Sequence, residues 1–318
     1  MFKFKTPKNE TKKLMSDVAL GKYSDINFEE KCQNAIKELT NSEYVKITSS
    51  GNNSILIALT SIEGSIIIPD QGGWHGFKQI AKFLNKEIIN LKTDLGIINP
   101  KTLDEIEIPE KSALIFTSFA GYSGEQDIKS IHKYCKNNNI ITIQDASAGI
   151  GDERKCLGNN QYSDIILAST GQPKLINVGN GGFIATNNKE IFDKSSISLK
   201  LSKTNEIICS GIYEEIKDVE KNLKDTINAR SYLKKHITNI IHAKKRGVNL
   251  IIQHEKPKEK IWDLKKTLAI DKSGFMNACP NYNRVKTKAI SIELKNLNYD
   301  CLKKEYLDKI IEAINNQQ

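Results

Sequence analysis

The chain has 318 residues, of which 39% are hydrophobic, and its formal net charge at pH 7 is +9. A chain of this length can bury a sizeable core and form one large and one smaller domain. No apolar run approaches the roughly 20 residues that a membrane-spanning helix requires, and the basic N-terminus lacks the apolar segment of a secretory signal. These features predict a globular protein of the cytoplasm and no contact with a membrane.

The distribution of basic residues and cysteines bears on whether the protein binds nucleic acid or a metal ion. The basic residues are mostly lysines spread along the chain, whereas arginine, the better reader of bases and phosphates, is rare. We therefore expect no nucleic-acid partner. Six cysteines stand at positions 32, 135, 156, 209, 279 and 301, with no Cys-x-x-Cys motif. This spacing predicts reduced thiols and no metal site.

Hydrophobic periodicity predicts an alternation of helices and strands over residues 43–190. The predicted helical segments are a lead-in over residues 1–40, an apolar helix over 55–62, a helix over 77–84, a short helix after Pro100 and a helix that Asp127 caps. The predicted strands cover residues 44–47, 66–69, 86–91, 113–118, 139–144, 163–168 and 182–186. This order is typical of an α/β fold, a three-layer sandwich around a mostly parallel sheet.

The alternation stops near residues 195–210. One long amphipathic helix is expected next, with a stripe formed by Ile212, Ile216, Val219, Leu223 and Ile227. Strands over 248–252 and 289–294 and a terminal helix over 302–314 follow. We therefore predict a smaller α+β domain over residues 205–318, after a lead-in and a large domain over residues 1–204.

One stretch, from Ser169 to Gly182, combines a lysine with three glycines between two apolar segments. Lys174 follows Ser169 by five residues, and Gly179, Gly181 and Gly182 come before the next predicted strand. Glycines allow the backbone to turn sharply, so two strands could hold the Lys174 amine at the edge of a sheet. We interpret Lys174 as a residue that binds pyridoxal phosphate (PLP) as a Schiff base. A lysine in an exposed hairpin is the alternative.

Polar residues at the ends of other predicted strands could complete such a site, because ligands collect at the carboxyl ends of strands in open α/β sheets. Ser50, Gly51 and Asn52 precede a helix, and a helix N-terminus favours a phosphate. Asp145 ends a buried strand, where a carboxylate is costly unless it meets a cation such as a protonated pyridine nitrogen. Ser147 follows it among small residues and is a further candidate for cofactor binding. Ordinary capped turns remain the alternative at these positions.

An aromatic side chain could cover a flat cofactor ring. Trp74 and His75 follow two glycines and precede a predicted helix, and either ring suits that position. A core tryptophan at the start of a helix is the alternative. The hydroxyl of Ser169 is a plausible ligand of the cofactor phosphate, together with the loop at Ser50.

With these residues in place, the chain resembles the DegT/StrS-type aminotransferases, which are fold type I PLP enzymes known largely as sugar aminotransferases. The family's Ser-x-x-x-x-Lys and Gly-x-Gly-Gly motifs fall on Ser169, Lys174, Gly179, Gly181 and Gly182. Its strand-terminal aspartate falls on Asp145, and its Ser-Gly-Thr loop falls on Ser50, Gly51 and Asn52. Its Gly-x-x-x-x-x-Asp segment falls on Gly121 and Asp127, and its early Phe-Glu pair falls on Phe28 and Glu29.

The resemblance implies a role for each matched position. Lys174 would carry PLP, Asp145 would contact the ring nitrogen, and Ser50, Gly51, Asn52 and Ser169 would hold the phosphate. The chain departs from the family pattern at Asn52, where threonine is usual, and at Ala148, where glutamine is common. Fold type I enzymes that act on amino acids often place a carboxylate-binding arginine in the small domain, and Arg284 is the expected counterpart.

The resemblance also implies a homodimer and a PLP-dependent aminotransferase that moves an amino group from an amino-acid donor to a carbonyl acceptor, with a sugar as one candidate. Two alternatives remain open. One is another PLP-dependent reaction of amino acids, a desulfurase or lyase, for which Cys156 is the candidate nucleophile. The other is a catalytically silent PLP-fold regulator that uses the net positive charge.

Overall fold

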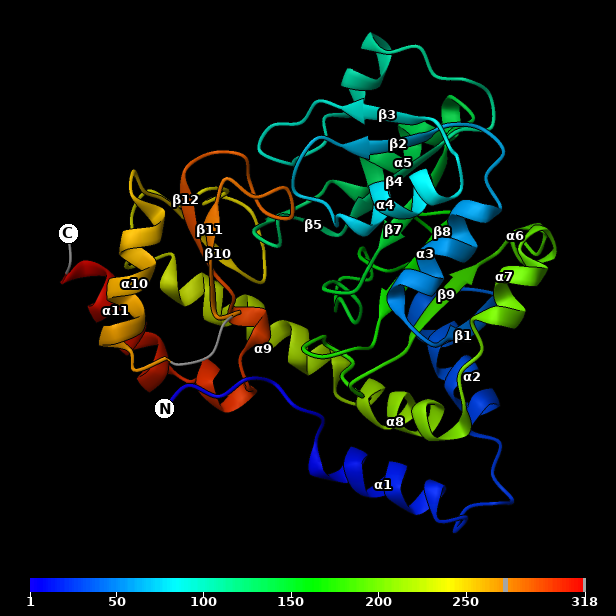
Figure 1. Cartoon of the computed structure of the whole chain (residues 1–318), viewed down its shortest axis with the longest axis horizontal. Coiled ribbons are helices and arrows are strands. Elements are labelled where there is room, and N and C mark those ends of the chain that lie inside the picture. Colours follow the sequence, from blue (N-terminus) through cyan, green and yellow to red (C-terminus); the bar gives the residue numbers. More distant parts are fainter. Residues whose placement is uncertain (271–273, 317–318) are drawn as a thin grey trace.

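A seven-stranded sheet forms the centre of the larger part of the molecule (Figure 1). The computed structural model describes residues 1–270 and 274–316. Across the sheet, the strands are β1 (Tyr44–Thr48), β9 (Gly182–Thr186), β8 (Ile165–Ser169), β7 (Ile141–Asp145), β4 (Ala113–Thr117), β2 (Ile66–Pro69) and β3 (Ile88–Leu91). β9 pairs antiparallel with β1 and β8, and the remaining neighbours pair in parallel. The predicted α/β fold with a mostly parallel sheet is confirmed.

Helices cover both faces of this sheet, which explains the nearly continuous apolar runs in its strands. Alternate residues of β4 contribute to opposite faces: Leu114 and Phe116 belong to one core cluster, whereas Ala113 and Ile115 belong to the other. The helices of the first face include α2 (Phe28–Thr40), α5 (Ile128–Asn137) and α8 (Glu206–Ile216). Those of the second face include α3 (Gly51–Thr60), α4 (Gly76–Phe83) and α6 (Glu190–Lys194).

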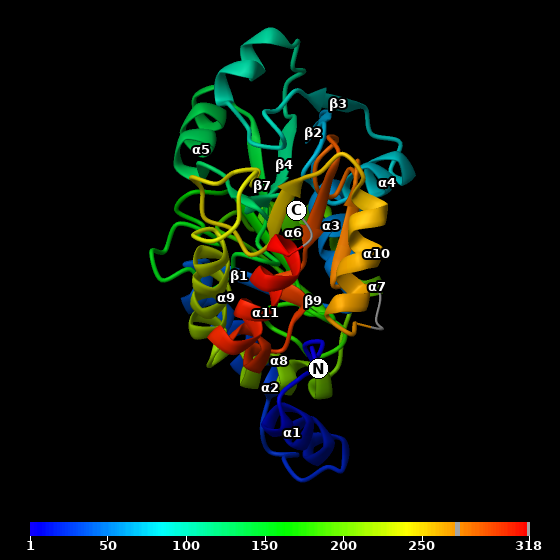
Figure 2. The ribbon, with the colours of Figure 1, turned by 90° about the vertical axis from the view of Figure 1, so that its left-hand side faces the viewer.

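A smaller antiparallel sheet lies beside the large one (Figures 1 and 2). Its strands follow the order β10 (Leu250–Gln253), β12 (Ala289–Ile292) and β11 (Met276–Cys279). The surrounding helical segments are α9 (Val219–Leu233), α10 (Pro257–Thr267), α11 (Lys304–Asn315), η2 (Leu294–Asn296) and η3 (Tyr299–Leu302). The N-terminal segment joins this core, because Phe2 and Phe4 pack against it and Phe4 pairs with Leu297.

The remaining elements are short or peripheral. They are α1 (Asn9–Ala19), η1 (Pro100–Glu105), β5 (Phe119–Ala120), β6 (Gly124–Glu125) and α7 (Ser196–Leu201). Within the described residues, no helix has both the length and the apolar character needed to cross a membrane. The proposed domain boundary near residue 204 stays a prediction. Four helices, α6 to α9, lie between the last strand of the large sheet, β9, and the first strand of the small one, β10.

The structure corrects three expectations about the elements. The single long helix expected over residues 212–227 is two helices, α8 and α9, because α8 packs against α1 and α2 while α9 extends into the smaller core. The helix expected over 55–62 begins at Gly51, because the Ser50 side chain caps it. α10 and β11 were not predicted. α10 is rich in lysine and buries only Lys260 and Leu264, so its apolar pattern is weak.

Candidate functional site

A cavity of about 230 Å³ opens at the carboxyl ends of β7 and β8. Its wall contains most of the residues that the sequence predicted to form a cofactor site, together with three residues that were not predicted. The lining residues are Ser50, Gly51, Asn52, Ile55, Trp74, Tyr122, Asp145, Ser147, Leu167, Ser169 and Lys174. Of the remaining candidates, His75 and Arg284 lie outside this wall.

Lys174 lies in the long connection between β8 and β9, which pair as an antiparallel hairpin with Ser169 opposite Gly182. This confirms the two strands expected around the lysine. Gly179 and Gly181 have φ angles of 84° and 90°, in the left-handed region that favours glycine. The Lys174 amide donates to the Gly171 carbonyl at 2.9 Å. The connection therefore presents the lysine to the cavity from a defined turn.

The N-terminus of α3 forms the polar corner of the cavity. The Ser50 Oγ accepts a hydrogen bond from the Asn53 amide at 3.1 Å. A Cβ at Gly51 would lie 2.6 Å from the Ser169 Cβ, and one at Gly182 would lie 2.8 Å from the Gly51 nitrogen. These glycines allow Ser169, β9 and the helix N-terminus to meet. Backbone amides and hydroxyls around a helix N-terminus suit a phosphate group.

The Asp145 carboxylate is buried at the end of β7, with 7% of the residue exposed. Its Oδ1 accepts from the Ser147 amide at 2.9 Å, and the Ser147 Oγ accepts from the Ser169 amide at 2.8 Å. Burial raises the pKa of Asp145, while the Ser147 hydrogen bonds and the charge of Lys174 act in the opposite direction. No ion pair to Asp145 forms within the described residues. A cationic ring nitrogen would supply the missing partner.

Trp74 and His75 occupy different environments. The Trp74 indole lines the cavity, and its Nε1 donates to the Asn52 Oδ1 at 3.1 Å. The His75 ring centroid lies 5.8 Å from that of Trp74 and 6.2 Å from that of Tyr282, and the His75 amide is bound to the Asn283 side chain. The structure therefore places Trp74, rather than His75, where a side chain could cover a bound ring.

The role expected for Arg284 does not fit its surroundings. Its Nε and Nη2 donate to the two carboxylate oxygens of Glu293, each at 2.7 Å, and its Nη1 donates to the Asn283 carbonyl. The guanidinium carbon also lies 4.6 Å from the Tyr122 ring centroid. Every guanidinium nitrogen is thus engaged, and a substrate carboxylate would have to displace Glu293. Arg284 is a buried structural residue behind the cavity wall.

Two buried lysines beside the site escaped the sequence analysis. Lys295 Nζ lies 4.5 Å from the Tyr122 ring centroid and donates to the Asn296 Oδ1 at 2.6 Å. Lys5 Nζ is buried without a hydrogen-bond partner in the described part of the chain and lies 4.4 Å from the Tyr299 ring centroid. Burial is the main cause that lowers the pKa of both amines, to about 7 for Lys5, and the charge of Lys174 lowers both further.

The burial of Lys5 predicts an unusual pH dependence of stability. Its pKa is about 7 in the folded chain against 10.5 for a free lysine, so between these values the folded state binds fewer protons than the unfolded state. The free energy of unfolding should therefore rise with pH through this window, and the full cost of burying the charge is present below pH 7. We expect Lys5→Met to stabilise the protein by roughly 3 to 5 kcal/mol near pH 6.

Urea denaturation at several pH values between about 6 and 9 measures this effect. The stability difference between Lys5→Met and the unchanged protein should shrink by about 1 kcal/mol per pH unit. Lys3→Met, two residues away on an exposed side chain, is the matched control and should change little. A difference that stays constant with pH would show that the Lys5 amine does not titrate in this window.

Cys156 contributes no atom to the cavity wall. It lies in a separate groove with Arg154 and Lys129. All six cysteines are free thiols. In the described residues, no group of three or more His, Cys, Asp and Glu side chains is arranged to hold a metal ion. The placement of Cys156 therefore gives no support to a desulfurase nucleophile at this cavity.

Curated relatives of this chain include a perosamine synthase and an altrosamine transaminase. GDP-perosamine synthase of Escherichia coli O157:H7 is 24% identical over 172 residues, which cover 53% of this chain and 47% of the relative. The UDP-4-amino-4,6-dideoxy-N-acetyl-beta-L-altrosamine transaminase of Campylobacter jejuni (subsp. jejuni serotype O:23/36, strain 81-176) is 26% identical over 211 residues, 64% of this chain and 53% of the relative. The chain thus spans about half the length of the curated relatives it matches.

Solved structures share the fold. Helicobacter pylori PseC, an aminotransferase involved in the biosynthesis of pseudoaminic acid, aligns with a TM-score of 0.78 and 15% identity over 99% of this chain and 98% of its own. NtdA of Bacillus subtilis, solved with bound cofactor PMP, aligns with a TM-score of 0.71 and 16% identity over 98% of this chain and 83% of its own. These likenesses confirm the PLP-dependent fold type I architecture.

Two family matches divide the chain. Residues 220–315 match the MJ1341 family C-terminal domain. Residues 7–206, which include the whole cavity wall, match the DegT/DnrJ/EryC1/StrS aminotransferase family. The chain belongs to the DegT/DnrJ/EryC1/StrS aminotransferase family.

Proposed function

We propose that the protein is a PLP-dependent aminotransferase that uses Lys174 as its catalytic amine. One observation carries the proposal: Lys174, the buried Asp145 carboxylate and the polar corner at Ser50, Gly51 and Ser169 line the same cavity. A cofactor with an aldehyde, a basic ring nitrogen and a phosphate would meet a matching group at each of its three ends. Family membership supports the same cofactor.

The residues of this chain would hold the cofactor as follows. The hydroxyls of Ser50 and Ser169 and the first amides of α3 would bind the phosphate, with Asn52 beside them. Asp145, fixed by Ser147, would face the ring nitrogen and keep it protonated. Trp74 would cover the ring, in the orientation set by its hydrogen bond to Asn52.

When bound, PLP supplies an electron sink that stabilises negative charge on the α-carbon of an amino acid. Lys174 Nζ would hold the cofactor until a donor takes its place. As a free amine, Lys174 Nζ would then accept the proton from the donor's α-carbon and return it on the cofactor side as a general acid. Asp145 would keep its negative charge opposite the protonated ring throughout.

The substrates and the assembly are further parts of this proposal. An amino acid would be the donor, and a carbonyl compound the acceptor. The relatives named as a perosamine synthase and an altrosamine transaminase support a sugar acceptor. The family resemblance supports a homodimer. The six free thiols fit a reducing compartment such as the cytoplasm.

A single-turnover assay without an acceptor tests the reaction class. The PLP-loaded protein is mixed with individual amino acids, and the 2-oxo acid, ammonia and sulfide that appear are measured. An aminotransferase should release one 2-oxo acid per bound cofactor from its true donor and then stop, because the amino group stays on the enzyme. Cys156→Ala should behave like the unchanged protein. Continuous release of ammonia or sulfide would instead identify a lyase or a desulfurase, and failure to retain PLP would favour a regulator.

A further inference from the structure

The groove that Cys156 lines has a volume of about 430 Å³ and lies where loops of the large sheet meet the loop that precedes β10. It shares no lining residue with the cofactor cavity. Three segments form it: the turn from β6 into α5, the loop after β7 and residues 244–246. Its lining residues are Glu125, Gln126, Asp127, Ile128, Lys129, Arg154, Cys156, Lys244, Lys245 and Arg246.

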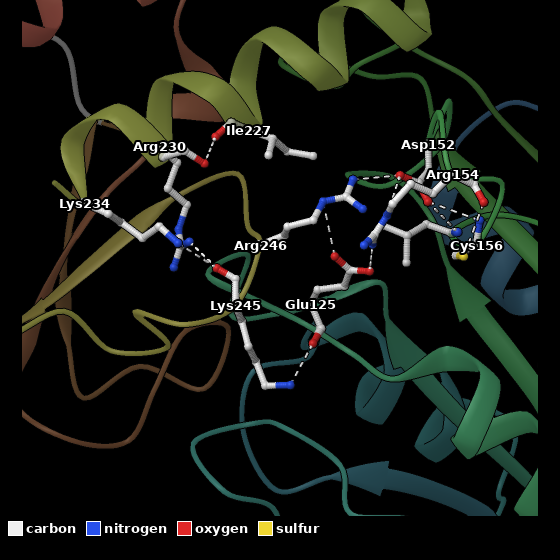
Figure 3. A network of polar contacts seen from close by, with 11 residues as sticks. Glu125, Asp152, Arg154, Cys156, Ile227, Arg230, Lys234, Lys245 and Arg246 are labelled. Carbon is white, nitrogen blue, oxygen red and sulfur yellow. Dashed lines mark hydrogen bonds and ion pairs between the residues drawn. The ribbon is translucent and has the colours of Figure 1, made fainter.

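Two arginines form a fixed framework in this groove (Figure 3). Arg154 and Arg246 both pair with the Glu125 carboxylate, Arg246 with its Nε 3.4 Å from Oε2. Arg246 Nη2 also lies 2.7 Å from the Asp152 Oδ1. The amides of Cys156 and Leu157 hold the other oxygen of Asp152, at 3.1 and 3.3 Å. The positions of both guanidiniums are therefore determined by contacts from two separate parts of the chain.

The cations of the groove outnumber its available carboxylates. Five cationic side chains line it, against the carboxylates of Glu125 and Asp127 in its wall and that of Asp152, which pairs with Arg246. Glu125 is shared by the two arginines, and Asp127 caps α5 by accepting from the amide and hydroxyl of Ser130.

The other cations of the groove have donors to spare. Among the described residues, Lys129, Lys244 and Lys245 form no ion pair with a carboxylate. Arg246 Nη1 is buried and has no hydrogen-bond partner there. A buried donor without a partner is uncommon in folded proteins. The groove thus carries a positive excess that the carboxylates of its wall do not balance.

We propose that this groove binds a phosphate-bearing anion with at least two negative charges, of the pyrophosphate class. The volume exceeds that of one phosphate, and the lysines stand on two sides of it. Guanidinium and ammonium groups are favourable partners for phosphate oxygens. Such a ligand would bridge the loop after β7 and the loop before β10, and would hold these two segments together.

Calorimetric titration with inorganic pyrophosphate, at constant ionic strength, tests the proposal. The PLP-loaded protein is used, so that the cofactor occupies the polar corner of the cavity. One saturable site per chain is expected, and sulfate at the same ionic strength should not reproduce it. Lys129→Gln/Lys244→Gln should weaken pyrophosphate binding at least tenfold, because it removes two cations that have no carboxylate partner in the described residues and leaves the Glu125 network in place. The matched control, Lys189→Gln/Lys200→Gln, removes two exposed lysines elsewhere and should bind as the unchanged protein does.

Two results would overturn the assignment. One is unsaturable binding, or equal affinity in the groove variant and its control. The other is loss of pyrophosphate binding in Ser169→Ala, since that result would place the anion in the cofactor cavity. The inference does not depend on the proposed aminotransferase activity. If the protein fails to retain PLP, the same titration on the unloaded protein still separates the groove from the cavity through these variants.

Discussion

Replacement of Lys174 with alanine is expected to lower the rate of the complete amino transfer by about 10³-fold or more. The reason is that Lys174 Nζ would both hold the cofactor and carry the proton to and from the donor's α-carbon, and positioned acid–base catalysis alone contributes about 10² to 10⁴. Release of 2-oxo acid from the donor, measured under single-turnover conditions, reports the loss directly.

The matched control is Lys189→Ala, since Lys189 is an exposed lysine after β9 that lies outside the cavity wall. It should retain full activity. Added methylamine should partly restore proton transfer in Lys174→Ala, because a small free amine can enter the space of the missing side chain. A Lys174→Ala protein that keeps the activity of the control would remove Lys174 from the proposed mechanism.

Replacement of Arg284 with methionine is expected to destabilise the protein by about 3 to 5 kcal/mol, because it leaves the Glu293 carboxylate buried without its main partner. Glu293 is completely buried, and Arg284 and Lys295 together hold its pKa at about 2 despite the opposing effect of burial. Denaturation in urea near neutral pH measures the loss.

The ionised state of Glu293 also determines how the stability of the protein changes with pH. Because its pKa is lowered from 4.5 in the unfolded chain to about 2, the stability that it contributes is present above pH 4.5 and lost as the pH falls toward 2. In Arg284→Met/Glu293→Gln this pH dependence should disappear and most of the lost stability should return. Lys288→Met, which removes the exposed partner of Glu255, should cost less than about 1 kcal/mol. Similar losses for Lys288→Met and Arg284→Met would contradict the importance of the buried pair.

Much of the large sheet could be predicted from the sequence because its strands are short apolar runs separated by polar turns. The order of these runs fixed which residues follow a strand, and parallel strands bring their carboxyl ends to one edge. Asp145 and the Ser50 loop could therefore be placed near Lys174 before any contact was known. The glycines after Lys174 also carried a local signal, since two of them adopt left-handed angles that other residues avoid.

Other features could not be predicted because they depend on contacts between distant segments. Lys5 and Lys295 look like the many surface lysines of this chain, and only the docking of the N-terminal segment on η2 buries them beside Lys174. Arg284 was expected to face a substrate, but the sequence carries no sign that Glu293, the residue that follows β12, would bind it. Tyr122 lies within the segment Gly121–Asp127 that resembles the family, yet its position in the cavity wall depends on a turn in which both Gly121 and Tyr122 have left-handed φ angles.

Borohydride reduction of the PLP-loaded protein, followed by peptide mass spectrometry, tests the central claim most directly. Reduction fixes the cofactor to the lysine that holds it. We predict that the cofactor mass will appear on the peptide that contains Lys174, and that Lys174→Ala will carry no such label. A label on Lys5 or Lys295, the two other buried amines beside the cavity, or a label that persists in Lys174→Ala, would contradict the assignment of Lys174.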